Sequence, residues 1–416
     1  MRAILSFGRV ALCASTAAVL AFACSSDNAP GGSDGGTPDS SMKGSGGKAG
    51  SGGASTGGKS SGGSSGTGGS GATPGTGGKV SAEAGIPDAG DGGVVAPSLC
   101  AGKTGADQIA CGQYMVEHLD ACGDCHTPRV AGGAPDTTKI LAGNPSFADL
   151  DGIAGNGIGN LPAPNLTQLK TAKWTAQDVM DCILDGKRSA AHGGPVVPVM
   201  PYVTLHNMAK VDAEAIAAFI LSLTPITNDI PAREPLPASI PAAALPVPPV
   251  DPTKIPDPVI DKSDPSYADA MFGKYLAAEA GVCMDCHTER LPNQQVDMSR
   301  PFGGGQPFVL GVPFGTVISA NLTTDPTDGL KNWTPGLVKT LVKTGVNNNG
   351  DMICPPMPVG PQGAFGGLTD AHALAIGAYI THLPPVSNGK DSGGPFHLCL
   401  LTPPPGDAGA KDSGHD

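Results

Sequence analysis

Aromatic and charged residues are both scarce in this chain of 416 residues. Phe, Trp and Tyr together make up 4% of the sequence, whereas glycine occurs 62 times and proline 41 times. Because so few large side chains are present, we expect small cores that something other than side chains helps to fill. The formal net charge of −12 argues against nucleic acid as a partner and favours docking to a basic patch on another protein.

After the first 24 residues, no hydrophobic run is long enough to cross a bilayer. The apolar run Val10–Ala23 follows two arginines and is too short to span, so residues 1–24 are predicted to be an export signal. Small residues before Cys24 favour lipoprotein processing with acylation of that cysteine, whereas Ala21–Ala23 suits ordinary signal peptidase. We therefore expect a periplasmic or cell-surface protein, with Cys24 as a candidate lipid anchor to a membrane.

Composition divides the rest of the chain into five parts. Residues 25–97 are dominated by Gly and Ser and predict a flexible tether, and residues 389–416 predict a mostly disordered tail. Residues 98–226 and 263–388 each have the size of an ordinary domain. Between them, residues 227–262 are rich in proline, which predicts an extended, semi-rigid connection.

Four of the eleven cysteines belong to two Cys-x-x-Cys-His motifs, Cys122–His126 and Cys283–His287. The sequence around them repeats as well, in the pairs Gly112/Gly273, Tyr114/Tyr275, Thr127/Thr288, Arg129/Arg290, Asn165-Leu166-Thr167/Asn321-Leu322-Thr323, Trp174-Thr175/Trp333-Thr334 and Met200-Pro201/Met357-Pro358. Near the end of each copy, an aromatic residue stands six positions before a proline, at Phe219 and Tyr379. One ancestral unit therefore occurs twice.

Each copy predicts three short helices separated by loops. The first helix leads into the motif, over 106–119 in one copy and 266–280 in the other, where Asp264 or Ser266 would cap the start. The second follows the tryptophan, and the last covers 212–223 or 369–383 and stops at a proline.

Local signals support the second helix in both copies. Thr175 and Asp178 form a capping-box pair, while Thr334 is a cap followed by Pro335 at the first helical position. Gly112 and Gly273 lie in the first helices and predict a close crossing that admits an aromatic side chain, Phe219 or Tyr379, from the last helix. Between each motif and its tryptophan we expect only loop, because Gly, Pro and Asn dominate there.

The motif spacing is that of covalent haem attachment. Two cysteines separated by two residues can form thioethers to the vinyl groups of one haem, and the histidine that follows is placed to ligate its iron. The same cysteines could instead form a zinc site made of the four thiols, or a thioredoxin-like redox pair. The zinc site does not account for the two histidines, the repeated methionines or export. The thioredoxin-like pair is disfavoured because no parallel-sheet pattern surrounds either motif.

A second axial ligand is expected on each iron. Met200 and Met357 are the candidates because a repeated methionine in a loop before the last helix suits His/Met coordination, which raises the potential. Met352 competes with Met357 locally but fits the repeat less well. Cys182 or Cys354 could also ligate iron in place of methionine, and so could His192 or His206, which flank Met200.

These residues resemble class I cytochrome c domains, especially the tandem-haem cytochrome subunits that accept electrons from periplasmic alcohol, aldehyde and gluconate dehydrogenases. The resemblance rests on the repeated motifs and covers nearly all of residues 105–386. It implies an all-α fold of two tandem cytochrome c class I domains, each a small helical fold around one covalent haem with long irregular loops. The haem-binding residues that it implies are Cys122, Cys125, His126 and Met200, then Cys283, Cys286, His287 and Met357.

Two departures from that family stand out. Its subunits often carry three haems, whereas this chain has two motifs, and Cys354 lies unusually near Met357. The remaining cysteines, Cys100, Cys111, Cys182, Cys354 and Cys399, leave disulfide pairing open, with a Cys354–Cys399 bond as one arrangement.

The sequence thus predicts a di-haem c-type cytochrome with two haem c groups, which transfers electrons between a redox protein donor, such as a dehydrogenase, and a terminal acceptor. We expect it to be a carrier or electron-transfer subunit rather than an enzyme, because nothing resembles a flavin, quinone or nucleotide site. The alternative is a two-haem oxidoreductase such as a peroxidase or thiosulfate dehydrogenase, which needs an open or displaceable iron ligand.

Overall fold

The computed structural model describes residues 97–388, apart from 131–133, 146, 148–160, 233–243 and 312–314. Every described residue lies in one compact unit of the chain, Gly75–Asp416. The predicted export signal, Cys24, nearly all of the tether, and the tail therefore lie outside the described residues.

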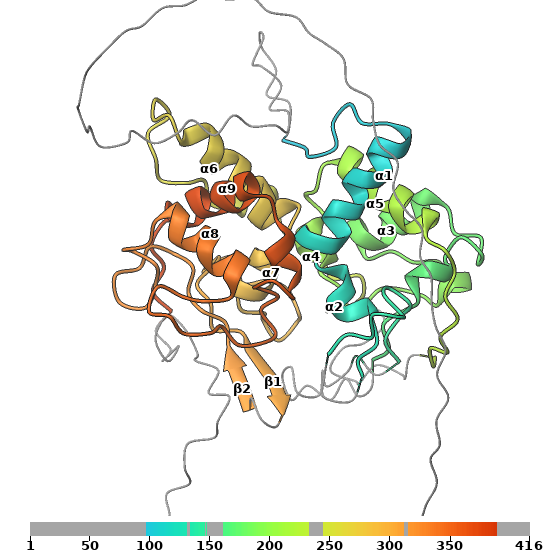
Figure 1. The fold of residues 1–416 in the computed structure, drawn as a ribbon. Helices are drawn as coiled ribbons and strands as arrows, with labels where there is room; N and C mark the ends of the chain where they lie inside the picture. The colour runs from blue at the N-terminus through green and yellow to red at the C-terminus, as the bar shows by residue number, and fades with distance from the viewer. Residues whose placement is uncertain are drawn as a thin grey trace, which may run out of the picture. The chain divides into compact units, whose positions relative to one another are not determined.

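The first copy of the repeat consists of short helices joined by loops (Figure 1). Helix α1 (Gly105–Tyr114) continues without a break into a π-helical turn, η1 (Met115–Leu119). The motif itself forms α2 (Cys122–His126). The later elements are η2 (Leu166–Gln168), α3 (Ala176–Asp185), η3 (Ala190–His192), α4 (Tyr202–Leu205) and α5 (Lys210–Ser222).

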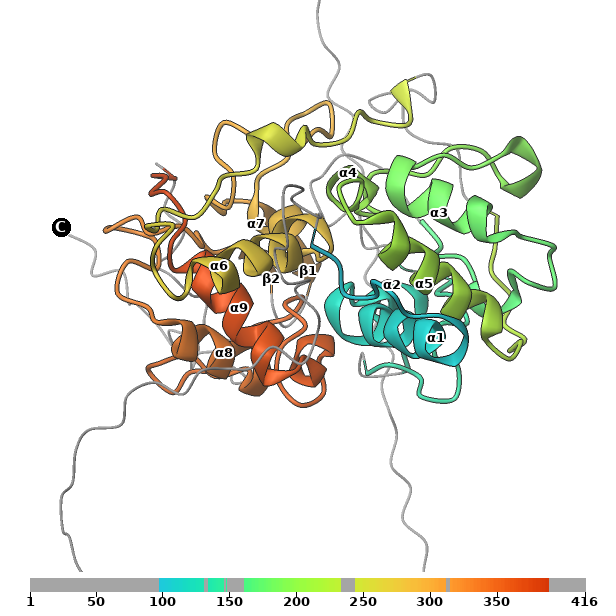
Figure 2. The ribbon, with the colours of Figure 1, turned by 90° about the horizontal axis from the view of Figure 1, so that it is seen from above.

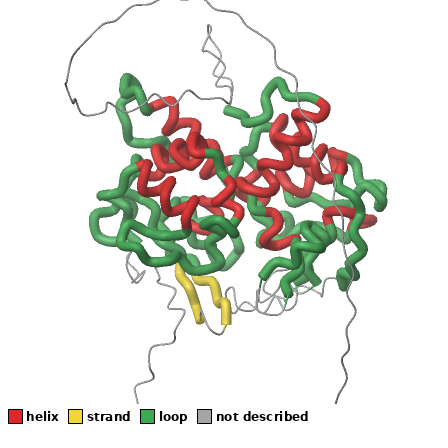
Figure 3. Tube along the Cα trace, viewed as in Figure 1, coloured by secondary structure: helices red, strands yellow, loops and turns green. Residues whose placement is uncertain are grey.

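The second copy presents a similar order of elements. After a single turn, η5 (Pro252–Lys254), come α6 (Tyr267–Lys274), η6 (Tyr275–Glu279), α7 (Cys283–His287), β1 (Pro307–Gly311), β2 (Gly315–Ile318), α8 (Pro335–Thr344), η7 (Ala364–Gly367) and α9 (Asp370–Ile380). Both copies place a π-helical turn directly before the motif. The described residues are therefore helix-rich with few strands, as expected for a cytochrome c fold (Figure 3).

One expectation was wrong in the second copy. We expected only loop between the motif and Trp333, but β1 and β2 form an antiparallel pair in which Pro307 pairs with Ile318 and Phe308 with Val317. The strands contain β-branched and aromatic residues between glycines, which favour a hairpin over irregular loop.

The long helices pack in matching pairs. Helix α1 packs against α5 and α6 against α9, while α3 and α8 cover the same last helices (Figure 2). A Cβ on Gly112 would clash with the backbone carbonyl of Ala215, and one on Gly273 with that of Ala375. The expected close crossing is confirmed. At Gly112 the three nearest atoms all belong to the backbone of Ala215 and Ile216, so the approach of Phe219 stays a prediction there.

In the second copy, Tyr379 does approach the glycine, since a Cβ on Gly273 would lie 2.9 Å from its Cβ atom. The aromatic residue thus contributes beside the backbone carbonyl.

The helix starts largely follow the predicted caps. Thr175 and Asp178 form the capping box, and Thr334 accepts from the Leu337 N–H with Pro335 at the first helical position. Ser266 occupies the N-cap position of α6, but its side chain bonds to Asp264 instead of capping the helix. The α5 helix begins two residues earlier than expected, and α9 ends three residues earlier than expected.

A single cluster of buried side chains draws on both copies, from Leu99 to Leu383. The proline-rich connection also contributes to it through Val247, Val250 and Ile255, which are almost fully buried. The Val250 N–H donates to the Val203 carbonyl at 2.8 Å, so this part of the connection is packed on the first copy. In the part of the chain that the structure describes, no helix is long and apolar enough to cross a membrane.

Candidate functional site

The two Cys-x-x-Cys-His motifs form short helices of identical length, α2 and α7. Each follows a π-helical turn that ends the first helix of its copy. Cys122, Cys125, Cys283 and Cys286 are all unpaired thiols. The structure therefore leaves both cysteines of each motif available for thioether formation.

The two motif histidines have the same environment. The Nδ1 atom of His126 lies 2.8 Å from the carbonyl oxygen of Pro164, and Nδ1 of His287 lies 2.8 Å from that of Ala320. A carbonyl oxygen only accepts, so Nδ1 carries the proton and Nε2 keeps its lone pair for a metal. Both rings are buried, and burial lowers the pKa of both imidazoles, which favours the neutral form that ligates iron.

The repeated Asn-Leu-Thr segment holds those carbonyl groups in place. The Nδ2 atom of Asn165 donates to the Ile226 carbonyl at 2.9 Å, and Nδ2 of Asn321 donates to the Val386 carbonyl at 2.8 Å. In each copy the asparagine Oδ1 also accepts from the threonine two residues on. The acceptor carbonyl directly precedes this asparagine, so the segment fixes the chain that orients the histidine.

The threonine after each motif has a matching role that the sequence alone did not reveal. Thr127 Oγ1 accepts from the Leu141 N–H at 3.1 Å, and Thr288 Oγ1 accepts from the Phe302 N–H at 2.9 Å. The histidine carbonyls accept as well, His126 from Gly143 and His287 from Gly304. The loop after each motif is therefore bound to the motif itself.

The thiols are in surroundings that disfavour the thiolate. Burial raises the pKa of Cys125 and of Cys283 to about 12, and it raises the pKa of Cys122 and of Cys286 as well. A redox pair of the thioredoxin type needs a lowered thiol pKa instead. Among the described residues, no group of three or more His, Cys, Asp or Glu side chains is arranged to hold a metal ion.

The predicted distal residues, Met200 and Met357, occupy equivalent places. Each is partly buried against the core and lies in a loop that leads through a short helical turn, α4 or η7, toward the last helix. The competing Met352 is 56% exposed, which removes it as an internal ligand. Ligation by Met200 and Met357 stays a prediction.

The cysteines that could replace methionine are engaged elsewhere. Cys354 is disulfide-bonded and cannot ligate iron as a thiolate; the expected Cys399 partner lies outside the described residues. The Cys182 thiol donates to the Lys187 carbonyl at 3.3 Å. A second disulfide joins Cys100 to Cys111.

The two histidines near Met200 have contacts within the first copy. The His192 ring stacks on Trp174 with centroids 4.3 Å apart, and His206 Nδ1 lies 2.8 Å from the Leu184 carbonyl and 3.0 Å from Asp185 Oδ1. Because an imidazole bound through Nδ1 keeps Nε2 for a metal, the bis-histidine alternative stays a prediction.

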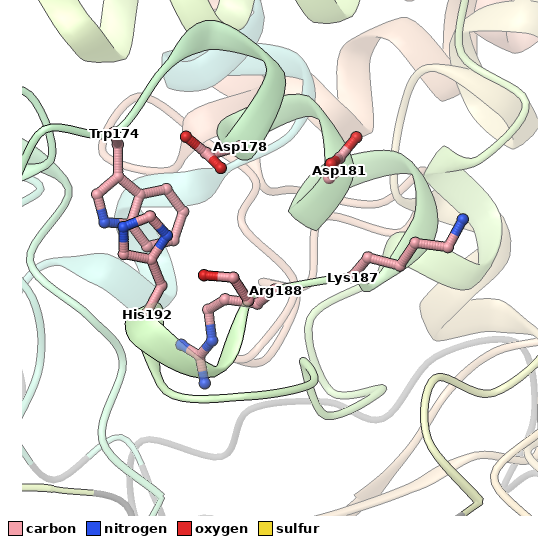
Figure 4. Close-up of a pocket in the computed structure, with 7 residues that line it drawn as sticks. Trp174, Asp178, Asp181, Lys187, Arg188 and His192 are labelled. Carbon is pink, nitrogen blue, oxygen red and sulfur yellow. The ribbon is translucent and has the colours of Figure 1, made fainter.

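A pocket of about 260 Å³ lies beside the Trp174–His192 stack (Figure 4). Its charged side chains already have partners within the chain: the Asp178 carboxylate accepts from the Thr175 N–H and hydroxyl, Arg188 donates to the Gly193 and Gly194 carbonyls, and Lys187 pairs with Asp185. The pocket therefore presents little unused hydrogen-bonding capacity to a ligand.

The residues present fit covalent haem on the chemistry of their donors. Each copy offers two unpaired thiols, one neutral imidazole fixed through Nδ1, and a partly buried methionine sulfur. Thiols, imidazole and thioether are the groups that attach and ligate haem c. The same set occurs in both copies.

Comparison with known proteins gives a consistent result. No family model matches the chain. The chain is 34% identical over 133 residues to the gluconate 2-dehydrogenase cytochrome c subunit of Pantoea cypripedii, an alignment that covers 32% of this chain and 27% of the relative. It is 26% identical over 305 residues to the cytochrome c subunit of a quinone alcohol dehydrogenase from Gluconobacter oxydans, covering 68% of this chain and 56% of the relative.

A third relative is a diheme cytochrome c-type protein of Cereibacter sphaeroides, 32% identical over 111 residues, which are 26% of this chain and 33% of that protein. The chain thus spans roughly a quarter to just over half of the length of these relatives. It is homologous, at modest identity, to cytochrome c subunits of quinone alcohol, gluconate and fructose dehydrogenases and to a diheme cytochrome c. The resemblance found in the sequence is confirmed.

Proposed function

We propose that this homologue of dehydrogenase cytochrome c subunits is a di-haem c-type cytochrome, which carries electrons from a protein donor such as a dehydrogenase to a terminal acceptor. The observation that carries the proposal is the matched geometry of His126 and His287. Both donate Nδ1–H to a backbone carbonyl at 2.8 Å directly after two unpaired thiols. Neither a structural histidine nor a disulfide framework requires that arrangement twice.

The residues of each copy would share the work of holding one haem. Cys122 and Cys125 would form its thioethers, His126 would present Nε2, and Met200 would supply the second axial ligand. In the second copy the same roles fall to Cys283, Cys286, His287 and Met357. When bound, each haem iron takes up and releases one electron, and thioether sulfur as an axial ligand raises its potential.

The domain boundaries belong to the same proposal. Residues 98–226 and 263–388 would be two class I cytochrome c domains, joined by residues 227–262. The relatives' names supply the kind of donor, since three of them are cytochrome subunits of gluconate, alcohol and fructose dehydrogenases. Export, a periplasmic or surface location, and a lipid on Cys24 complete the proposal.

The experiment is spectroscopy on the purified holoprotein and on two variants. Mass spectrometry and haem quantification should give two covalent haems per chain. Optical and EPR spectra should show two low-spin haems with the far-red methionine–sulfur band. Met200→Ala and Met357→Ala should each remove about half of that band.

A matched control separates ligand loss from general disturbance. Met352→Ala changes a methionine that lies five residues from Met357 but is largely exposed, so its spectra should equal those of the unchanged protein. One haem per chain, a high-spin haem, or an effect of the control as large as that of Met357→Ala would contradict the proposal. Turnover of peroxide or thiosulfate by the isolated protein would favour the enzymatic alternative instead.

A further inference from the structure

The tyrosines of the repeated Gly-x-Tyr segments both reach across to the other copy. The Tyr275 hydroxyl donates to the carboxylate of Asp212 and accepts from the Ala209 N–H at 3.2 Å. The Tyr114 hydroxyl lies 2.6 Å from Nδ1 of His372 and accepts from the Thr369 N–H at 3.1 Å. Each tyrosine therefore binds an amide and a side chain of the opposite copy.

These two contacts are equivalent by position. Ala209 is the N-cap of α5 and Thr369 is the N-cap of α9, and Asp212 and His372 each stand three residues further on. Tyr114 of the first copy contacts the start of the last helix of the second copy, and Tyr275 of the second copy contacts the start of the last helix of the first. Such reciprocity is the signature of a two-fold interface, here between two parts of one chain.

A second reciprocal contact involves the turns that follow the predicted axial methionines. The α4 turn, after Met200, packs on η6 of the second copy, and the η7 turn, after Met357, packs on η1 of the first. In the second contact, His118 Nδ1 lies 3.2 Å from the Ala364 carbonyl oxygen. Each copy thus places its post-methionine turn on the helical turn that precedes the other copy's motif.

The second motif adjoins the first copy at this interface. Its helix, α7, packs on the α4 turn. Asp285, inside the second motif, accepts from Arg290 at 2.5 Å and from Thr204 Oγ1 of α4 at 3.5 Å. The interface between the copies therefore reaches the second Cys-x-x-Cys-His helix.

We propose that Tyr114 and Tyr275 are positioning residues, which hold the two copies together and keep the two Cys-x-x-Cys-His helices at one fixed separation. The hydroxyl contacts of these two tyrosines with the opposite copy are called the clasp below. Tyr114 and Tyr275 each stand two residues after the glycine of a close helix crossing, Gly112 or Gly273. Because the clasp spans both copies, it makes the two domains unfold as one cooperative unit. The use of this separation for electron transfer rests on the proposed function, but the clasp itself does not.

The test uses the holoprotein with Tyr114→Phe, Tyr275→Phe and both changes together. Phenylalanine keeps the ring and removes only the hydroxyl. Tyr379→Phe is the control, because this buried hydroxyl donates to the Pro256 carbonyl at 2.8 Å and not to the other copy's last helix. The measurements are calorimetric unfolding, amide hydrogen exchange, and the magnetic interaction between the two ferric haems by EPR.

The clasp predicts a specific pattern of exchange. Tyr114→Phe should speed exchange of the Thr369 amide about tenfold and leave the Ala209 amide unchanged, whereas Tyr275→Phe should do the reverse. The double variant should turn one calorimetric transition into two. It should also weaken the haem–haem magnetic interaction while the optical spectrum of each haem stays as it was.

Several outcomes would overturn the proposal. A single transition and an unchanged magnetic interaction in the double variant would show that the tyrosines do not position the copies. If Tyr379→Phe changed unfolding and amide exchange as much as Tyr114→Phe and Tyr275→Phe do, the effects would reflect a general loss of packing and not the contacts between the copies. If the double variant does not fold, hydrogen exchange of the Thr369 and Ala209 amides in the single variants tests the proposal. Unchanged exchange at both amides would overturn it. If the protein carries no haem, the proposed function is wrong, but calorimetric unfolding and amide hydrogen exchange still test whether the two tyrosines hold the copies together.

Discussion

Gly112 faces the backbone carbonyl of Ala215 so closely that any side chain at this position would collide with it. The same relationship joins Gly273 to Ala375 in the second copy. These crossings set the distance between the first and last helices of each copy. Tyr114 and Tyr275 stand two residues after these glycines.

Gly112→Ala and Gly273→Ala should therefore each destabilise the protein. The added methyl group must push two helices apart, and overpacking of this kind costs about 1–3 kcal/mol in the free energy of unfolding. Urea unfolding of each variant measures the loss. Gly336→Ala is the matched control, since Gly336 is an exposed helical glycine with open space around it, and alanine should stabilise it by about 0.5–1 kcal/mol. Equal effects at the three positions would contradict the crossing argument.

The disulfide between Cys100 and Cys111 gives a second prediction. It closes a loop of 11 residues at the start of the first copy, where Cys100 is 2% exposed. Removing the bond by Cys100→Ser with Cys111→Ser should lower the free energy of unfolding by about 3 kcal/mol, because the unfolded chain regains the entropy of the open loop. Cys182→Ser, which removes a thiol without a disulfide, should change stability much less. A double variant as stable as the parent protein would refute this role.

Local signals predicted most of the helices and both motifs. Caps such as Thr175 and Thr334, and prolines after the last helices, act within a few residues, so they can be read from sequence alone. The β1–β2 hairpin was missed, although its β-branched residues between glycines were a usable signal. The assignment of Met200 and Met357 as ligands stays a prediction from the repeat.

Two kinds of contact could not be predicted from the sequence. One kind is made by backbone groups, and the other by side chains that differ between the two copies. The carbonyls of Pro164 and Ala320 orient the motif histidines, yet a carbonyl carries no residue identity, and only the repeated asparagine that follows marked the place. The tyrosine clasp escaped detection for another reason. Its side-chain partners, Asp212 and His372, differ between copies, so the repeat in the sequence does not extend to them.

Because His372 is buried, we expect the folded protein to lose stability against unfolding in acid. Burial lowers its pKa from 6.5 to about 4, so the folded protein resists a proton that the unfolded chain accepts. Its contribution is therefore present above pH 6.5 and is lost as the pH falls toward 4. His372→Gln should flatten the fall in melting temperature between pH 6.5 and 4.5. If the variant follows the pH profile of the unchanged protein, His372 is not the group responsible.

For Asp120 we expect the opposite dependence of the unfolding free energy on pH. Both of its carboxyl oxygens are buried without a hydrogen-bond partner among the described residues. Burial, and then the nearby charge of Asp212, raise its pKa well above the ordinary 3.8. The unfolded chain releases this proton more readily than the folded protein does, so the contribution of Asp120 is fully present below pH 3.8 and is lost as the pH rises through the folded-state pKa.

Asp120→Asn should remove that penalty. The variant should match the parent protein in unfolding free energy near pH 4 and exceed it increasingly as the pH rises to 7.5, as measured by urea unfolding at both values. Asp212→Asn is the contrasting control, because the Asp212 carboxylate accepts from Ser98, Leu99 and Cys100 as well as from Tyr275, and should lose about 2 kcal/mol or more. A constant difference between Asp120→Asn and the parent protein across this range would show that Asp120 is not held neutral by its burial.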